Sequence, residues 1–221
     1  MAVKPEIVRV HTFIDAQNLY SSAKDAFKYK LPNFDPVLLS KEVTAMMPGR
    51  VLKRVHLYTG IHEREENPFW HDYWNNKLRA LEKNELVHIF KKPLVYRDIR
   101  WTDADGKEHV IRRAEEKGID LRMGLDLVRL AVNGEYDVAI IFSQDNDLEE
   151  AVNEVHAIRQ YFDRWIYLEC AFPDNPERGN RGIRNTQWRI ITEEMYMRCI
   201  DERDYRPYPT IPPSDSFSTR S

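Results

Sequence analysis

Two apolar segments of the sequence lead directly to aspartates, a residue type whose carboxylate oxygens bind hard divalent cations. Residues 7–14 are followed by Asp15, and residues 136–142 are followed by a polar stretch that holds Asp145 and Asp147. Apolar, β-branched runs of this length predict buried strands. If the two strands are parallel neighbours, their carboxyl ends place the three carboxylates at one edge of the sheet, where open α/β folds bind ligands.

A third segment supplies Asp120, which opens a predicted helix over residues 120–133. At about 100° per residue, Asp120 falls in the middle of an apolar arc that includes Leu121 and Leu125 and that we expect to face the core. A charge in that position is unfavourable without a partner. The same geometry puts Asp126 on the polar face of the helix, beside basic side chains.

Carboxylates held together at one sheet edge repel one another unless a cation lies between them. Mg²⁺ or Mn²⁺ suits an all-oxygen site, binds phosphates and lowers the pKa of a coordinated water so that the water can attack. The pattern therefore predicts phosphodiester hydrolysis. Each aspartate also has a structural interpretation, since Asp120 and Asp145 could cap helices and Asp15 could be a turn residue.

Strands that alternate with helices position these residues. We predict strands over residues 7–14, 51–61, 85–96, 136–142 and 165–172, and helices over residues 18–27, 36–47, 69–83, 120–133 and 148–161. The Asp105-Gly106 pair predicts a small β-hairpin between residues 99–101 and 109–111. This alternation predicts an α/β fold, a three-layer α/β/α sandwich with a mostly parallel central sheet and the small hairpin as an addition.

The length of 221 residues suits one domain, which we place at residues 1–204, followed by a Pro/Ser-rich mobile tail at residues 205–221. With 33 Lys and Arg against 36 Asp and Glu, the net charge of −3 excludes a protein that binds nucleic acid through overall positive charge. Two cysteines exclude a disulfide framework and a Cys-rich zinc site, and they suit a reducing compartment. No signal peptide or membrane span is predicted, so we expect a soluble, cytoplasmic protein.

Three short segments, taken in order, resemble the motifs of NYN domains. They are residues 14–18 (Ile-Asp-Ala-Gln-Asn), 116–120 (Glu-Lys-Gly-Ile-Asp) and 143–147 (Ser-Gln-Asp-Asn-Asp). NYN domains are PIN-like nuclease domains, and the sequence is most similar to their LabA-like bacterial branch. The resemblance covers residues 8–168, and it implies a PIN-like, Rossmannoid fold and metal-dependent cleavage of RNA.

The resemblance also implies a role for each residue that matches a motif. The implied metal ligands and catalytic carboxylates are Asp15, Asp120, Asp145 and Asp147, and Asn18 would orient a water or a phosphate. Asp126 and Ser143 are secondary candidates. The sequence departs from the family where Ala16 replaces a frequent glycine and where residues 144–147 replace a Gly-Asp-Ser-Asp run, but the acids are kept.

An RNA substrate, which we expect to be single-stranded, needs local basic residues. The cluster closest in sequence to Asp120 is Arg112, Arg113 and Lys117, and we select it as the candidate RNA contact, although such clusters are more often solvated surface. The aromatic residues of segment 69–74 have helical spacing, which favours packing in the core over base stacking. A homo-oligomer is also compatible with the sequence.

Two alternatives remain at the sequence level. Some NYN-like bacterial proteins are described as NADH-dependent 6-hydroxy-3-succinoylpyridine monooxygenases, but the eight glycines here include no Gly-x-Gly fingerprint for a dinucleotide. No set of haem or iron ligands is recognisable either. The second alternative is a non-catalytic regulator that binds RNA or a protein and keeps its acids for structure.

Overall fold

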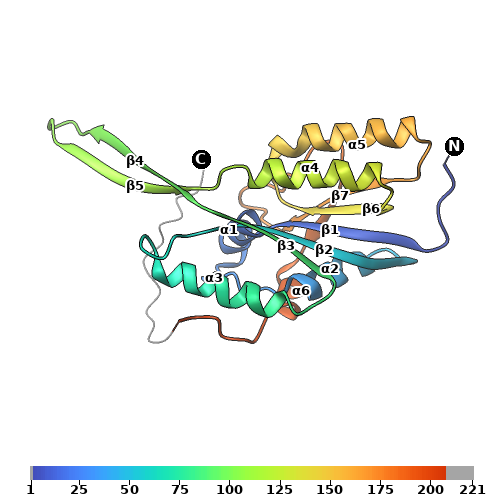
Figure 1. The fold of residues 1–221 in the computed structure, drawn as a ribbon, viewed down its shortest axis with the longest axis horizontal. Coiled ribbons are helices and arrows are strands. Elements are labelled where there is room, and N and C mark those ends of the chain that lie inside the picture. Colours follow the sequence, from blue (N-terminus) through green and yellow to red (C-terminus); the bar gives the residue numbers. More distant parts are fainter. Residues whose placement is uncertain (1, 208–221) are drawn as a thin grey trace.

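A sheet of six parallel strands forms the centre of the protein (Figure 1). The computed structural model describes residues 2–207. The strand order is β3-β2-β1-β6-β7-β8, with bounds Val87–Pro93, Arg50–Ile61, Val8–Asp15, Val138–Phe142, Tyr167–Pro173 and Gln187–Ile191. The chain runs outward in one direction from β1 through β2 to β3, and in the other from β6 to β8. The order therefore reverses between β1 and β6, the place where open α/β sheets bind ligands.

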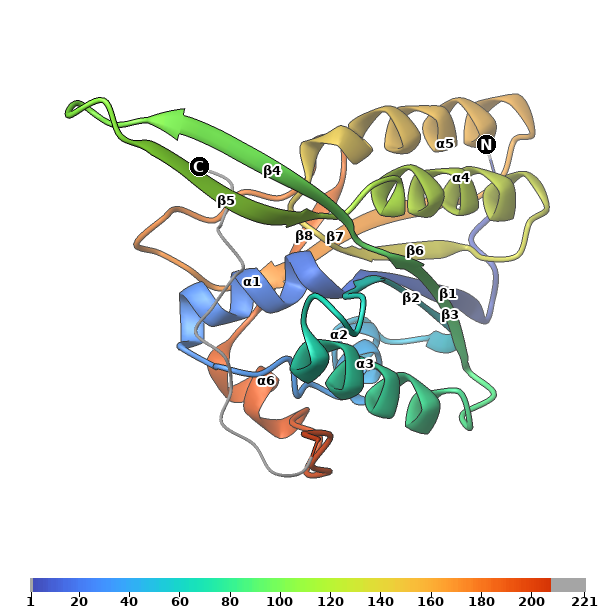
Figure 2. The same ribbon diagram turned by 60° about the vertical axis from the view of Figure 1, so that its left-hand side comes forward.

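Helices cover both faces of this sheet (Figure 2). One face carries α1, α2, α3 and α6, with bounds Ala16–Phe27, Pro36–Ala45, Pro68–Leu81 and Glu193–Arg198, and the other carries α4 and α5, Ile119–Val132 and Glu149–Tyr161. Successive strand residues feed the two cores alternately, as Phe13 packs with α4 and α5 while Ile14 packs with the helices opposite. The predicted three-layer α/β/α sandwich is confirmed.

Caps recognisable in the sequence define several helix starts. The side chain of Asp35 accepts hydrogen bonds from the backbone N–H of Val37 and Leu38, and Pro36 occupies the first helical position of α2. In α3 the residues with helical spacing, Trp70 and Trp74 among them, are buried as expected for core packing. These helices fix the layer beneath β1 and β2.

The segment predicted as one strand over residues 85–96 is two strands. It divides at Leu94, which is buried and whose backbone N–H donates to Ile61 O, just after Pro93, which has no N–H for a sheet ladder. The chain then leaves the sheet as β4, Val95–Thr102, and returns as β5, Glu108–Glu115. These strands pair antiparallel along their whole length, so the small hairpin is in fact a long arm that projects from the body (Figure 1).

The C-terminal part of the described chain differs from the sequence-based assignment. We predicted residues 165–172 as the last strand, but β8 and α6 follow it. The edge strand β8 is largely exposed, so its apolar pattern is too weak to recognise.

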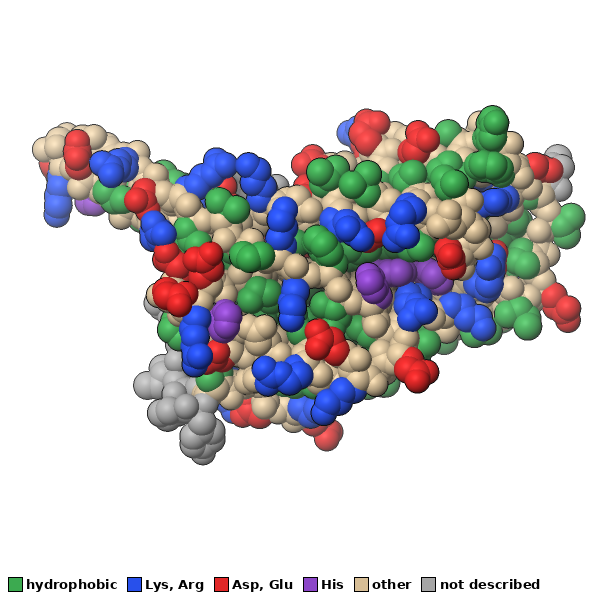
Figure 3. Space-filling view, in the orientation of Figure 1, with side chains coloured by type: hydrophobic (Ala, Val, Ile, Leu, Met, Phe, Trp, Pro, Cys, Tyr) green, Lys and Arg blue, Asp and Glu red, His purple; other side chains and the backbone are tan. Residues whose placement is uncertain are grey.

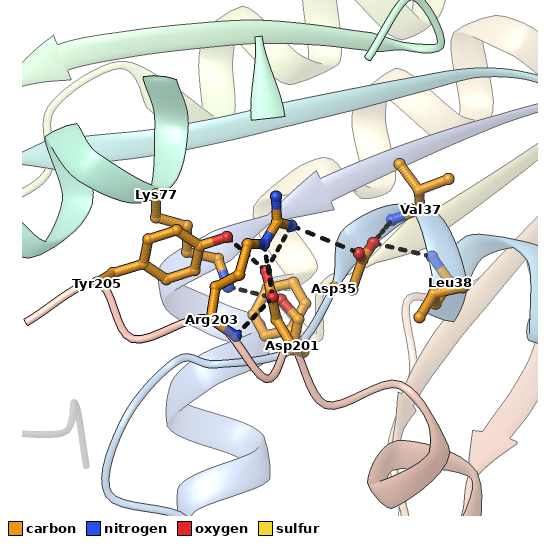
Figure 4. Close-up of polar contacts among 8 residues, drawn as sticks. Asp35, Val37, Leu38, Lys77, Asp201, Arg203 and Tyr205 are labelled. Carbon is orange, nitrogen blue, oxygen red and sulfur yellow. Dashed lines mark hydrogen bonds and ion pairs between the residues drawn. The ribbon is translucent and has the colours of Figure 1, made fainter. Parts of the chain in front are cut away.

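The segment after α6 is fastened to α3 by a buried polar group (Figure 4). Asp201 accepts hydrogen bonds from Arg203 and from the hydroxyl of Tyr205 within this segment. Asn76 of α3 donates to Tyr205 O at 3.2 Å, and Lys77 of α3 lies over the Tyr205 ring and donates to Phe34 O at 2.6 Å. Tyr205, which the sequence assigned to the start of the tail, is therefore buried against the domain. Residues 208–221 of the predicted tail lie outside the described residues. Within residues 2–207, none of the helices has the length and apolar character needed to cross a bilayer.

Candidate metal centre

Three aspartates from two different parts of the chain meet at the carboxyl edge of the sheet. Asp120, Asp145 and Asp147 each offer a carboxylate oxygen, and these oxygens all lie within 4.8 Å of one another. Asp120 belongs to the first turn of α4, whereas the other two follow β6 and belong to the short 3₁₀ helix η1, Asn146–Leu148, and its cap. Asp120 and Asp145 are half-buried and Asp147 is exposed, so the group is open to solvent on one side.

Two side-chain hydrogen bonds fold the chain after β6 so that its acids converge. The backbone N–H of Asp145 donates to Ser143 Oγ at 3.1 Å, and the N–H of Asp147 donates to Asp145 Oδ1 at 3.0 Å. Asp145 is therefore a helix cap, as its structural interpretation required, but this bond uses one carboxylate oxygen and a carboxylate has two. The capping role and a ligand role are compatible in this residue.

Asp15 ends β1 and caps α1, with its Oδ1 accepting from the N–H of Asn18 at 3.0 Å. It is only 6% exposed. Burial raises its pKa to about 6, backbone hydrogen bonds oppose that shift, and the charges of Asp145 and Asp120 add to it. Asp15 is thus a fourth acid in electrostatic contact with the group, although its oxygens are not among those within 4.8 Å.

Asn18 holds the loop that carries Asp145. Its Oδ1 accepts from the backbone N–H of Gln144 at 3.0 Å. The Gln144 side chain continues the connection, since it accepts from Ser22 Oγ at 2.9 Å and donates to Arg181 O at 2.8 Å. The structure therefore gives the carbonyl oxygen of Asn18 a structural task, the alignment of α1 with the β6 loop. The part played by Gln144 was missed at the sequence level, because a single polar residue between motif acids carries no signal of its own.

The segment that leads to Asp120 is fixed at two points. Glu116 accepts from the backbone N–H of Gly60 at the end of β2, and a Cβ on Gly60 would collide with Leu94 and would lie 2.7 Å from Glu116. Gly118, the N-cap residue of α4, has φ +76°, which disfavours any other residue. The motif residues Glu116 and Gly118 thus set the direction in which α4 begins and where Asp120 lies.

The predicted orientation of α4 is wrong on one flank of the helix only, because Gly124, Leu127 and Ala131, which share the line of Asp120, are buried as expected for the inward-facing arc. Leu121 and Leu125, which we placed toward the core, are 66% and 58% exposed, while Asp126, which we placed on the polar face, is buried. Asp126 accepts hydrogen bonds from Arg122 and Arg129 of its own helix and from the hydroxyl of Tyr58. The helix can face Asp126 to the sheet because these three donors compensate for its burial.

The pKa of Asp126 reflects that balance. Burial alone would raise it, but the hydrogen bonds from Arg122 and Arg129 outweigh burial and hold the pKa below its usual value. Asp126 therefore stays ionised and paired, and it is not part of the group of three. Ser143 is also buried, and its hydroxyl orients Asp145. Cys170 is buried against this loop, where its Sγ donates to Ser143 O at 3.0 Å, and burial raises the pKa of its thiol to about 12.

The basic residues proposed as RNA contacts lie in different environments. Arg112 forms ion pairs with Glu66 and with Asp98 across the arm, so its charge is already compensated. Arg113 lies on the other face of β5, and Lys117 is exposed in the short connection to α4. The three residues therefore do not form one patch.

The donor set at the centre fits a hard divalent cation such as Mg²⁺ or Mn²⁺. All three candidate ligands are carboxylates, a chemistry that such ions prefer and that disfavours soft, thiolate-seeking metals. Like charges at this separation are unfavourable together without a counter-ion.

Comparisons with known proteins identify the family. Residues 9–162, more than two thirds of the chain, match the NYN domain. Among solved structures, a protein of unknown function from Vibrio parahaemolyticus is 15% identical, with 92% of this chain and 98% of that chain covered and a TM-score of 0.46. The ribokinase of Giardia lamblia is 12% identical, with 66% and 41% covered and a TM-score of 0.31. No curated protein matches. Because the match spans most of the chain and all three motifs, the chain belongs to the NYN domain family of the PIN-like superfamily.

Proposed function

We propose that this protein is a metal-dependent endoribonuclease that hydrolyses phosphodiester bonds of single-stranded RNA. One observation carries the proposal, the convergence of Asp120, Asp145 and Asp147 within 4.8 Å. Membership of the NYN family supports it, since the family suggests a PIN-like nuclease. We also propose a cytoplasmic location, because Cys170 and Cys199 are buried and unpaired.

In this proposal each candidate site residue has its own task. Asp120, Asp145 and Asp147 hold Mg²⁺ or Mn²⁺, which when bound polarises a phosphate and promotes deprotonation of a water. Asp15 fixes the start of α1 and adds negative charge beside the ion. Asn18 and Ser143 hold the β6 loop in place, as their hydrogen bonds to that loop indicate.

The local geometry gives no support to the NADH-dependent hydroxylase alternative. A dinucleotide places its pyrophosphate at the start of the first helix after a glycine-rich turn. Here the turn from β1 to α1 is Asp15-Ala16-Gln17, and the carboxylate of Asp15 already occupies the N-terminus of α1. A second negative group at that position would be repelled.

Cleavage of end-labelled single-stranded RNA with Mg²⁺ or Mn²⁺ tests the proposal. We expect the wild type to cut, and Asp120→Asn and Asp145→Asn to lose at least about a hundredfold in rate, because each removes a ligand charge. Asp163→Asn is a matched control, since Asp163 follows the far end of α5 and has φ 45°, a conformation that asparagine adopts easily.

Two results would contradict the proposal. One is the absence of cutting by folded wild-type protein with either metal, and the other is equal cutting by the wild type and Asp145→Asn. RNA binding by a protein that never cuts would instead favour the non-catalytic regulator.

A further inference from the structure

The arm formed by β4 and β5 begins beside the start of α4 (Figures 1 and 2). β5 runs through residues 116–118 into α4, whose first turn holds Asp120. Within residues 2–207, these two strands form a sheet of their own and pair only with each other. A ribbon of two strands is only marginally stable in water by itself. The side chains on its two faces therefore indicate its function.

The two faces of the arm differ in composition. Residues directly opposite each other in an antiparallel pair share a face. The Trp101 face consists of the pairs Val95–Glu115, Arg97–Arg113, Ile99–Ile111 and Trp101–His109, and the Tyr96 face consists of Tyr96–Ala114, Asp98–Arg112, Arg100–Val110 and Thr102–Glu108. The Tyr96 face is partly engaged with the body, because Tyr96 hydrogen-bonds to His62 and Arg112 pairs with Glu66.

An ordered aromatic surface lies near the tip of the Trp101 face. The rings of Trp101 and His109 stack, with centroids 5.2 Å apart and an interplanar angle of 15°. Asp103 holds this pair, since it accepts from His109 Nε2 at 2.6 Å and from the backbone N–H of Asp105 and Lys107. Trp101 is nonetheless 42% exposed. A large aromatic ring that is held in place and left open to solvent is the kind of platform on which nucleic-acid bases stack.

Positive charge lies between this platform and the root of the arm. Arg97 and Arg113 face each other across the two strands, and Arg97 pairs with Glu115 at 3.6 Å, so these three side chains together carry one net positive charge. In the space-filling view, Lys and Arg side chains lie along one edge where the arm joins the body, next to a group of Asp and Glu side chains (Figure 3). The chain as a whole carries −3, so a polyanion that approaches the acidic group needs such a local surface.

We propose that the Trp101 face binds a single-stranded RNA segment that leads to the acidic group, with a base stacked on Trp101 and phosphates against Arg97 and Arg113. The part of this proposal in which the RNA leads to the acidic group rests on the proposed ribonuclease function. The apolar pair Ile99 and Ile111 lies between platform and arginines, where it would contact bases or sugars.

The length of the arm predicts how long the RNA must be. Trp101 lies six residue steps along β4 from Val95, at the root of the arm. At about 3.4 Å per strand residue this is about 20 Å, which corresponds to about six nucleotides at the stacked rise of about 3.4 Å. A tetranucleotide should therefore fail to reach both the acidic group and Trp101, whereas an oligonucleotide of about 12 nucleotides should reach both.

Fluorescence anisotropy with labelled oligoribonucleotides tests the proposal, measured with Ca²⁺ in place of Mg²⁺ or Mn²⁺ so that the carboxylates are neutralised by a hard cation while cutting is suppressed. We expect the wild type to bind the 12-mer more tightly than the tetramer, and Trp101→Ala/Arg113→Ala to lose about tenfold or more in affinity for the 12-mer. The double variant should also show a shallower dependence of affinity on salt, by about one unit of logarithmic slope for the lost phosphate contact. Trp101→Phe, which keeps an aromatic ring, should lose less affinity for the 12-mer than Trp101→Ala/Arg113→Ala.

The matched control is Arg100→Ala/Val110→Ala, which removes one arginine and one exposed apolar side chain at paired positions of the Tyr96 face. Equal losses in the two double variants, or equal wild-type affinity for both lengths, would overturn the proposal. So would a wild-type dimer that Trp101→Ala/Arg113→Ala abolishes in sedimentation without any change in RNA affinity, because the face would then bind a second copy.

The two proposals can fail separately. If RNA affinity depends on Trp101 but no cutting occurs, the result supports RNA binding by the Trp101 face and contradicts the proposed ribonuclease function. If cutting depends on Asp145 but RNA affinity does not depend on the Trp101 face, the result supports the proposed ribonuclease function and contradicts RNA binding by that face. Circular dichroism and the melting temperature of each variant show whether the domain remains folded.

Discussion

Two buried carboxylates, Asp126 and Glu169, each accept hydrogen bonds from a pair of arginines. Both have a pKa held below the usual value, since those hydrogen bonds outweigh the effect of burial. The carboxylates of the candidate metal centre have other carboxylates as neighbours instead. This contrast separates acids whose charge the fold itself compensates from acids that could bind a divalent cation.

Of the two arginine-paired carboxylates, Glu169 gives the more sensitive test of a role in stability, because it is fully buried on β7 between Arg50 and Arg189. We expect Glu169→Ala to lower the free energy of unfolding by about 3–5 kcal/mol, since the change leaves buried guanidinium groups without a counter-charge. Urea denaturation measures this loss. As a control, Glu154→Ala on the exposed side of α5 should change stability by no more than about 0.5 kcal/mol. A loss below about 1 kcal/mol for Glu169→Ala would show that the cluster contributes little.

The site residues were only partly predictable at this scale. Strand ends are readable from apolar runs, so Asp15, Asp145 and Asp147 could be assigned to the sheet edge. The burial of Asp126 could not, because a helical wheel assigns a carboxylate that lies beside basic residues to the polar face, whereas arginines three and four residues away can compensate a buried one. Both the helical wheel, which placed Asp120 within the inward-facing arc, and the resemblance to NYN motifs singled out this residue, and in the structure it is half-buried.

Most elements were predictable because strand and helix periods differ strongly in this chain, and their observed ends agree with the predicted ends within a few residues. The exceptions have local causes. Leu94 interrupts an apparently continuous strand because it is anchored to β2 and follows a proline. β8 was not predicted from the sequence because this edge strand has little apolar alternation.

The start of α4 supplies a prediction at the scale of the element. Gly118 has φ +76°, and Gly106, in the turn of the arm, has φ +80° with open space where a Cβ would lie. Alanine at either position should destabilise the protein by about 1 kcal/mol through backbone strain. Only Gly118→Ala should also displace Asp120 and weaken metal binding.

The readout is the rise in melting temperature on addition of Mg²⁺ or Mn²⁺, which depends on affinity by mass action. We expect this rise to shrink in Gly118→Ala and to persist in Gly106→Ala. If both variants keep the full rise, the backbone at Gly118 does not set the position of Asp120.

The stability of the whole molecule should depend on two histidines that no proposed reaction uses. His11 and His56 lie on neighbouring strands with their ring nitrogens 3.2 Å apart. Burial lowers their pKa values to about 4 and about 3, against 6.5 when exposed. The charged and titratable groups that act on this pair from the surrounding elements are Arg9, Arg54, His88, Asp126 and Asp137.

We expect the protein to lose stability as the pH falls below about 6.5. The unfolded chain then binds protons at His11 and His56 that the folded chain excludes, so each histidine removes up to about 2 kcal/mol by pH 5. Urea unfolding at pH 7 and pH 5 measures the sum. His56→Phe, which keeps a ring stacked on Phe13, should show a smaller difference between the two pH values. An unchanged difference would assign the acid sensitivity to other groups.

The arm enters and leaves the domain at one point, because Val95 and Glu115 are paired neighbours. Neither of the two hydrophobic cores contains a residue of the arm. An insertion or deletion of paired residues there would leave the sheet, the helices and the acidic group as they are. Such a modular attachment allows the arm to diversify during evolution independently of the domain, so that relatives with the same acids could differ in the molecules they recognise.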